Sequence, residues 1–242
     1  VVAAAANSEG AKSLAADLAS LAGGVETLSK NKCRVCWARI DPARIDRARL
    51  VEWHASGAPR RIASTDFPGG PFWSRPGLFA WDRIDAGSLL LAEHFPADLA
   101  GHGADLGCGV GYLGAALLAR CPGMTALDLY EAERMALDLA RENLGTRAHG
   151  IPLAFHWHDV TTGLRRNYDF IVSNPPFHVS REDRADLGQA FIAAAARHLR
   201  PGGRFLLVAN RHLPYERGLA AAFATSRVLA DEGGYKVIEA RK

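Results

Sequence analysis

The sequence is poor in cysteine and contains no long apolar run, and these two shortages narrow the class of protein. Its 242 residues include four cysteines, which lack the dense, even spacing of a disulfide scaffold. No apolar stretch approaches the roughly 20 residues of a membrane-spanning helix. The first residues carry no basic flank, so we predict no signal peptide. We therefore expect a cytoplasmic protein with no membrane partner.

Metal-site patterns are also scarce. Cys33 and Cys36 form a single C-x-x-C motif, but no second cysteine pair or histidine pair completes a zinc set. The residues between the two cysteines belong to a strand-like run. We predict no metal site and no redox site here.

Excess charge is small overall but unevenly distributed. The formal net charge is +3. Residues 30–61 hold nine basic residues against three acidic ones, a net of +6, so the remainder carries about −3. A basic segment beside a binding domain suits a polyanion such as RNA, and a solvated helix face with ordinary arginines is the alternative.

Glycine, by contrast, clusters in the stretch 104–114, which reads A-D-L-G-C-G-V-G-Y-L-G. A short apolar lead ending in Asp105 runs into the glycines and then at once into a helical run. Such a turn needs positive φ angles and lets a ligand lie against the backbone, while the helix start offers free NH groups. The pattern predicts a nucleotide-type cofactor site. Gly109, Gly111 and Gly114 also match the spacing of a dinucleotide fold, which stays an alternative.

Strand-like and helical runs alternate along most of the chain. They predict an α/β fold with a doubly wound, mostly parallel, seven-stranded Rossmann-like sheet. The pair Gly233-Gly234 turns the last two strands into an antiparallel edge hairpin. We assign this domain to residues 71–242. Residues 1–70 form a short basic N-terminal segment, with a helix opened by Asp41 as N-cap and Pro42 at its first position.

Acidic residues at two strand ends are candidates for cofactor contacts. The strand 125–130 contains Asp128 and is followed by Glu131. A ribose diol needs a carboxylate at the carboxyl edge of the sheet, where Glu131 fits better than Asp128. Asp159, just after the strand 153–157, could accept a hydrogen bond from an adenine amino group, and a simple turn cap is the alternative.

The stretch S-N-P-P-F-H at Ser173–His178 carries the chemistry. Two prolines remove two NH donors and lock φ twice, so the loop offers acceptors. An exocyclic amine can donate to the side-chain oxygen of Asn174 and to the carbonyl of Pro175, while Phe177 stacks on its planar group. An amine oriented in this way beside the glycine turn implies attack on a methyl sulfonium, so we predict S-adenosylmethionine as the cofactor.

Aromatic residues are concentrated in and after the loop that begins near residue 66. Phe72, Trp73, Phe79 and Trp81 could stack on bases or fill the edge of a core. Phe79 and Asp85 could also close over the cofactor, and a packing role is the alternative for both.

The glycine turn and the Asn-Pro-Pro-Phe loop together resemble class I methyltransferases acting on exocyclic amines. Four further stretches resemble the ribosomal RNA guanine-N2 methyltransferases of the small-subunit type, and the resemblance covers residue 76 to the end. The stretches are P-G-L-F-A-W-D-R-I-D-A-G-S, L-R-P-G-G, V-A-N-R-H-L-P-Y and the closing Y-K-V.

The resemblance implies methyl transfer to the N2 amine of a guanine in ribosomal RNA. The partner would be ribosomal RNA or the small subunit. We favour a monomer, and the sequence leaves the oligomeric state open. The family resembles two tandem methyltransferase-like domains, which would make residues 1–70 a remnant of the first. The implied catalytic residues are Asn174, Pro175 and Phe177; the implied cofactor-binding residues are Asp105, Gly107, Gly109 and Gly111 at the methionine end, Glu131 at the ribose, Asp159 at the adenine, and Asn174.

Other functions stay open from the residues alone. The acceptor could be an adenine amine in nucleic acid or a glutamine amide in protein. A non-catalytic RNA-binding domain could also keep the fold. A nicotinamide dehydrogenase is disfavoured because its chemistry does not call for Asn-Pro-Pro-Phe.

Overall fold

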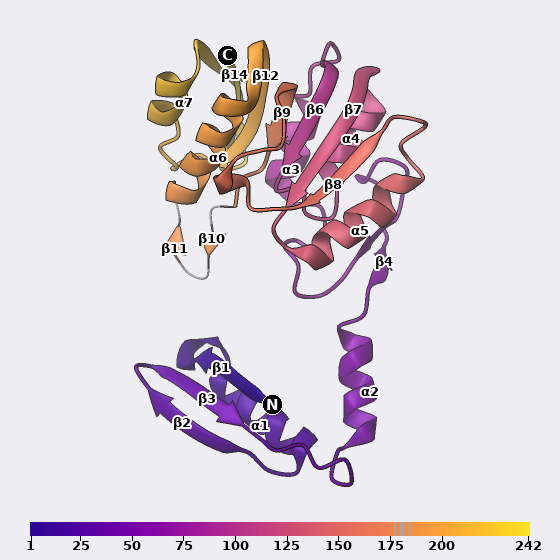
Figure 1. Ribbon diagram of the computed structural model, residues 1–242, viewed down its shortest axis with the longest axis vertical. Coiled ribbons are helices and arrows are strands. Elements are labelled where there is room, and N and C mark those ends of the chain that lie inside the picture. Colours follow the sequence, from indigo (N-terminus) through magenta and orange to yellow (C-terminus); the bar gives the residue numbers. More distant parts are fainter. Residues whose placement is uncertain (177, 180–181, 184) are drawn as a thin grey trace. The chain divides into compact units, whose positions relative to one another are not determined.

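The chain divides into two compact units, Val1–Ala58 and Pro59–Lys242 (Figure 1). The computed structural model describes residues 1–176, 178–179, 182–183 and 185–242. The division falls earlier than the boundary expected between residues 70 and 71. The reason is that strand β4 (Arg60–Ile62) pairs with β5 (Phe72–Ser74), so residues 59–70 belong to the second unit.

The N-terminal unit is a small antiparallel sheet with a helix packed on it. The strand order is β1 (Val2–Ala6), β3 (Cys33–Trp37), β2 (Glu26–Lys30). The short η1 (Asn7–Glu9) follows β1 in the chain, and α1 (Ala11–Ala22) packs on β1 and β3. The strand predicted at Cys33 is confirmed. Strand β2 reads E-T-L-S-K and is exposed along its whole length, so no apolar alternation marked it.

The second helix of this unit, α2 (Arg47–Ser56), begins later than predicted. Its N-cap is Asp46, whose Oδ1 accepts a hydrogen bond from the backbone NH of Arg49 at 3.0 Å. Asp41 instead accepts from the NH of Ala43 at 3.0 Å and closes a turn. Both aspartates can accept the hydrogen bond of an N-cap, and Asp46, which lies directly before the helix, is the one that caps it.

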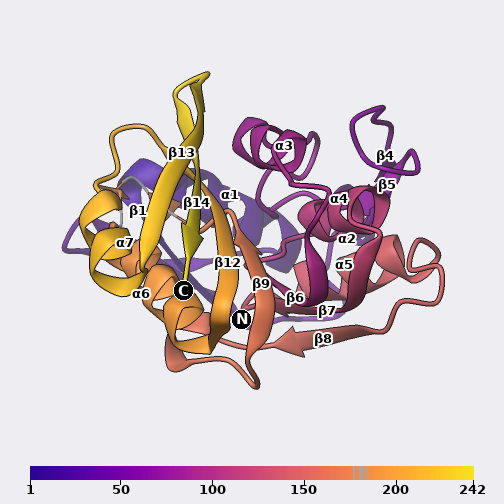
Figure 2. The ribbon, with the colours of Figure 1, turned by 90° about the horizontal axis from the view of Figure 1, so that it is seen from above.

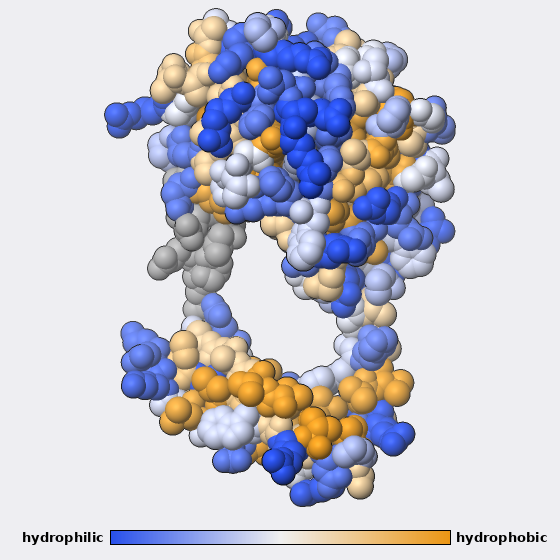
Figure 3. All heavy atoms as spheres, viewed as in Figure 1, coloured by the Kyte–Doolittle hydropathy of each residue, from blue (hydrophilic) through white to orange (hydrophobic). Residues whose placement is uncertain are grey.

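Apolar side chains gather on the surface of the N-terminal unit, as Figure 3 shows. A groove of about 330 Å³ there is lined by residues that include Val1, Leu14, Leu21 and Trp53. The C-x-x-C motif does not form a site within this unit. Its two cysteines are three positions apart on β3 and therefore face opposite sides of the sheet, with Cys33 exposed and Cys36 buried.

The second unit contains the predicted seven-stranded sheet. Its order is β13-β14-β12-β9-β6-β7-β8, with parallel pairing from β8 to β12, and β14 antiparallel to both of its neighbours. The predicted edge hairpin is confirmed. The strands are β6 (Ala100–Leu106), β7 (Gly123–Glu131), β8 (Leu153–Trp157), β9 (Tyr168–Ser173), β12 (Leu199–Asn210), β13 (Thr225–Glu232) and β14 (Tyr235–Arg241).

Helices cover both faces of this sheet (Figure 2). One core lies between the sheet and α3 (Ala86–Glu93), α4 (Tyr112–Arg120) and α5 (Arg134–Gly145). The other lies under α6 (Ala185–His198) and α7 (Glu216–Ala222), with the short η2 (Val160–Thr162) beside them. The strands β10 (His178–Val179) and β11 (Glu182–Asp183) form a small antiparallel pair between β9 and α6. No helix in the described parts of the chain combines the length and apolarity needed to cross a membrane.

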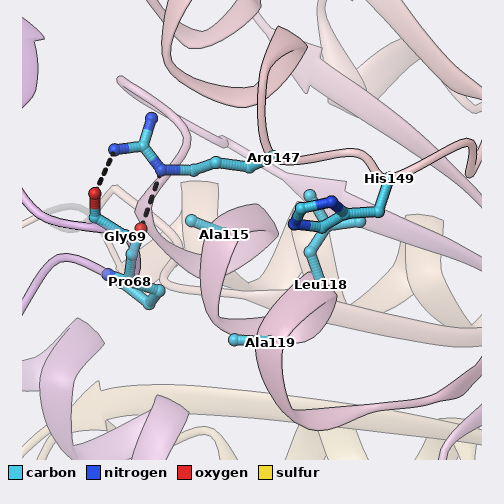
Figure 4. Close-up of a pocket in the computed structure, with 7 residues that line it drawn as sticks. All are labelled: Pro68, Gly69, Ala115, Leu118, Ala119, Arg147 and His149. Atoms are coloured by element: carbon cyan, nitrogen blue, oxygen red, sulfur yellow. Dashed lines mark hydrogen bonds between the residues drawn. The ribbon is translucent and has the colours of Figure 1, made fainter.

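Residues 66–76, which we call the lead-in loop, are joined to α5 by polar side chains. Asn143, 1% exposed, donates to the carbonyls of Trp73 (2.9 Å) and Val110 (2.8 Å) and accepts from the NH of Trp73 (2.6 Å). Arg147 donates to the carbonyls of Pro68 and Gly69 at the edge of a small cavity of about 100 Å³ (Figure 4). These bonds connect the lead-in loop to the glycine turn through Val110.

The aromatic residues near this loop separate into two environments. Phe72 is fully buried and stacks on Phe67 with ring centres 4.8 Å apart, so it belongs to the core. Phe79 has 66% of its surface exposed. Of these two, only Phe79 is accessible to a ligand.

Candidate functional site

The glycine turn lies at the carboxyl end of β6, where the sheet opens. The NH groups of Gly107 and Cys108 donate to the carbonyl of Tyr130 on the neighbouring β7, at 2.9 and 3.0 Å. Gly109 has φ +53° and a Cβ there would meet nothing within 4 Å. Its backbone conformation, rather than lack of space, therefore favours glycine. Gly111, in the left-handed region at φ +93°, is the N-cap of α4.

Glu131 connects the end of β7 to this turn. Its Oε2 accepts from the NH of Gly109 at 2.8 Å and its Oε1 from the NH of Glu133 at 2.9 Å. Each carboxylate oxygen has further lone pairs for ligand hydroxyls. The carboxylate is thus held in one orientation at the carboxyl edge of the sheet.

Asp128, the other candidate for the ribose, lies in a different place. Its carboxylate accepts from Tyr168 (2.8 Å) and contacts the Nε2 atoms of His102 (2.8 Å) and His156 (3.1 Å). Burial by itself would raise its pKa, but these hydrogen bonds outweigh burial and hold the pKa below its ordinary value. Asp128 does not line the cavity described next, whereas Glu131 does.

A cavity of about 230 Å³ brings four of the predicted site residues together. Gly107, Glu131, Asp159 and Asn174 line it, along with Phe79 and others. A second cavity of about 260 Å³ contains Gly109 and shares Glu131 and Phe79 with the first. The two together form an extended site along the carboxyl edge of the sheet.

Four other predicted residues are not part of this lining. Asp105, Gly111 and Pro175 line neither cavity, although Asp105 and Gly111 belong to the strand and turn that shape it. Phe177 lies outside the described residues.

Asp105 is fully buried beneath the glycine turn. Neither of its carboxylate oxygens makes a hydrogen bond of ordinary geometry with a described residue, although the nearby backbone NH of Gly114 acts to lower the pKa of the carboxyl. Burial, followed by the charge of Glu131, raises the pKa of this carboxyl to about 8. A buried polar group without a partner is costly and is typical of a site that is completed by a ligand.

Asp159 caps η2, as the alternative reading of this residue predicted. Its Oδ1 accepts from the NH of Thr161 (2.9 Å) and from the hydroxyl of Thr161 (2.7 Å), and these bonds lower its pKa. Because Asp159 also lines the cavity, an adenine contact stays a prediction.

Asn174 follows β9, whose last residue Ser173 is bound to the end of β6 by a 2.7 Å hydrogen bond from its hydroxyl to the carbonyl of Leu106. The side-chain Nδ2 of Asn174 donates to Asp85 Oδ2 at 2.9 Å and to Ser88 Oγ at 2.8 Å. Both amide hydrogens are used in this way, which leaves the amide oxygen as the acceptor available to a ligand. Sequence reasoning missed Ser88 and considered Asp85 only as a closing or packing residue. The N-cap pattern at the start of α3 was the signal available for both.

The charged lining of the two cavities is acidic. Glu131 and Asp159 line the first and Glu131 and Glu133 the second, and the described residues of the two linings include no lysine or arginine. An acidic cavity favours a cationic ligand. The NH of Gly109, which a pyrophosphate would need, is already taken by Glu131. The geometry therefore argues against the dinucleotide alternative.

Comparison with known proteins identifies the family of the chain. Residues 69–239 match the methyltransferase small domain family. A ribosomal RNA small subunit methyltransferase C from Sodalis glossinidius is 39% identical over 215 residues, covering 84% of this chain and 58% of that protein. A protein of the same name from Shewanella loihica is 37% identical over 166 residues, covering 69% of this chain and 47% of that protein.

A solved structure is similar over the whole chain. It is the T. thermophilus 16S rRNA N2 G1207 methyltransferase RsmC in complex with AdoMet and guanosine, with a TM-score of 0.78 and 26% identity, covering 100% of this chain and 64% of that one. The chain spans about half the length of the curated relatives it matches. Since the family match extends over well more than half of the sequence, the chain belongs to the methyltransferase small domain family.

Proposed function

We propose that this chain transfers a methyl group from S-adenosylmethionine to the exocyclic N2 amine of a guanine in small-subunit ribosomal RNA. The observation that carries the proposal is the amide of Asn174, which lines the cavity with its oxygen available as an acceptor. The names of the curated relatives and the ligands of the T. thermophilus structure support the same substrate and cofactor.

The site fits the proposed cofactor in shape and charge. The acidic side chains among the described lining residues suit a ligand with a sulfonium and an ammonium group. In this proposal the glycine turn holds the methionine end, Glu131 the ribose and Asp159 the adenine. The cofactor, when bound, supplies an electrophilic methyl group.

The role of the protein in the reaction is to orient the acceptor amine. The side-chain oxygen of Asn174 and the carbonyl of Pro175 accept its two NH groups, which directs the nitrogen lone pair toward the methyl group. Phe177 is proposed to stack on the base. Orientation and proximity of this kind can contribute roughly 7–11 kcal/mol. No strong base is needed, because alkylation makes the amine proton acidic and it can leave to solvent.

Ribosomal RNA as the partner has independent support in the charge distribution. Residues 30–61 carry a net charge of +6, and electrostatic attraction to phosphate provides much of the affinity for RNA. We further propose that the N-terminal unit is part of a first methyltransferase-like domain, since the T. thermophilus structure matches the chain over its full length.

Methyl transfer to unmodified small subunits tests the proposal. We would supply labelled S-adenosylmethionine, identify the labelled nucleoside, and compare the wild type with Asn174→Ala. Glu142→Ala is a matched control, because this exposed residue lies on α5 away from the cavities.

The proposal expects label in N2-methylguanosine, a large loss in Asn174→Ala and an unchanged rate in the control. Label in an adenine or in a protein glutamine would reassign the acceptor. Absence of cofactor binding would overturn the enzymatic function and leave a non-catalytic RNA-binding domain.

A further inference from the structure

We propose that Asp85 is a positioning residue, which holds the side-chain amide of Asn174 in the one orientation that can accept a hydrogen bond from the substrate amine. This inference rests on the proposed function and assigns a role to a residue that lies outside the cavity lining. The two residues are 89 positions apart in the sequence, and α3 brings them together.

The geometry places one carboxylate oxygen between two donors. Asp85 is the N-cap of α3, and its Oδ2 accepts from the backbone NH of Ser88 at 2.9 Å and from Nδ2 of Asn174 at 2.9 Å. The hydroxyl of Ser88, a residue only 8% exposed, lies 2.8 Å from the same Nδ2. The contact of Asn174 with the first turn of α3 is therefore made by its side-chain NH₂ group.

The chemistry of the two partners decides which way the amide points. A side-chain amide can exchange the places of its oxygen and nitrogen by a half-turn, and a serine hydroxyl accepts either arrangement because it both donates and accepts. An ionised carboxylate only accepts. Asp85 thus permits the arrangement with the NH₂ group toward α3 and penalises the reverse, in which two oxygens would face each other.

This selection has a direct consequence for the substrate. With the NH₂ group bound to Asp85, the oxygen of Asn174 is the group left for an amine that donates two NH bonds. A reversed amide would present donors to a donor, so the amine would lose its acceptor and its alignment. Asp85 acts on the reaction only through Asn174.

Packing holds the carboxylate where it is needed. A Cβ at Gly87 would lie 3.0 Å from ring atoms of Tyr235 on β14 and 3.1 Å from Asp85 Oδ2. The first turn of α3 is therefore in close contact with the sheet at this point. Such close packing limits the freedom of the capping carboxylate.

The first test is Asp85→Asn, which keeps the size of the side chain and its ability to cap α3. Its amide can turn its NH₂ group toward a reversed Asn174 in exchange for the cap on the Ser88 NH, so the reversed amide is penalised less than by a carboxylate. We expect kcat to fall by roughly tenfold or more, as small losses of alignment do, while the dissociation constant of S-adenosylmethionine changes by less than about twofold. Asp82→Asn is the matched control, since Asp82 is exposed and pairs with its neighbour Arg83.

The second test exchanges the two side chains. In Asn174→Asp two carboxylates face each other, and activity should be lost. In the double variant Asp85→Asn/Asn174→Asp, the new amide donates to the new carboxylate, whose other oxygen can accept from the substrate. We expect the double variant to be at least fivefold more active than Asn174→Asp, a coupling that independent structural damage would not produce.

A third measurement does not depend on the substrate. The side-chain NH₂ signals of Asn174 in ¹⁵N-labelled protein should be protected from solvent exchange in the wild type and in Asp82→Asn, and lose protection in Asp85→Asn. If the wild type methylates no guanine, the proposed function fails while this signal still tests the contact. Unchanged protection in Asp85→Asn, or losses that simply multiply in the double variant, would overturn the positioning role.

Discussion

The carboxylate of Glu131 accepts a hydrogen bond from the backbone NH of Gly109 across 2.8 Å, which joins the end of β7 to the glycine turn after β6. A second bond, from the NH of Glu133, holds its other oxygen. Both bonds come from backbone groups, so the carboxylate is in place before a ligand arrives. Preorganised groups of this kind gain affinity because little ordering is needed on binding.

We first predict that Glu131→Gln weakens binding of S-adenosylmethionine by roughly tenfold, about 1.4 kcal/mol. The glutamine keeps one acceptor but presents a donor to one of the two NH groups and loses the charge. Glu131→Ala should weaken binding further. Isothermal titration calorimetry measures both, with Glu142→Gln as the control; equal affinities for wild type and Glu131→Gln would contradict the assignment.

A second prediction concerns Asp105, whose pKa is raised to about 8 by burial and then by the charge of Glu131. Between about pH 4 and 8 the native state holds a proton that the unfolded chain has released, so the free energy of unfolding falls as pH rises through this window. Asp105→Asn cannot ionise. Without cofactor, the variant should gain stability over the wild type with rising pH, by on the order of a few kcal/mol.

Denaturant unfolding at pH 5 and at pH 9 measures this effect. Wild type and Asp105→Asn share all other titrating groups, so the difference between their changes in free energy of unfolding with pH reports Asp105 alone. Parallel pH profiles would mean that Asp105 is ionised in the folded protein.

Third, Asn143→Ala should lower the free energy of unfolding by about 2–3 kcal/mol, because it removes three hydrogen bonds to half-buried backbone groups of Trp73 and Val110. Release of Val110, which belongs to the glycine turn, should also weaken cofactor binding. Urea denaturation and calorimetry check the two effects, and Glu142→Ala next to it on α5 is the control. A stable variant with normal affinity would show that water replaces the amide.

Fourth, Asp128→Asn should destabilise the protein by roughly 3 kcal/mol at neutral pH, since it removes a buried charge from two histidines and Tyr168. The pKa of Asp128 is lowered, so its contribution is present above about pH 4 and is lost as pH falls through its native pKa. The difference in free energy of unfolding between variant and wild type should therefore become smaller at acidic pH. A gap that is constant from pH 7 to pH 3 would contradict an ionic contribution.

Local patterns in the sequence determined most of the second unit. The strand 153–157 has the bounds that were predicted, because its apolar run begins after Pro152 and ends at the polar pair His158-Asp159. The edge hairpin follows from Gly233 and Gly234, both at positive φ. The glycine turn and the Asn174 loop could be recognised because turn chemistry is confined to neighbouring residues.

Only the tertiary structure decided the contacts between distant segments. It placed Asp85 against Asn174, joined Asn143 to Trp73, and separated Glu131 at the cavity from Asp128 in its network of histidines. The pairing of β4 with β5 moved the domain boundary for the same reason. Periodicity and turn residues report the local backbone, whereas the partner of a polar side chain depends on which strands and helices become neighbours when the sheet is assembled.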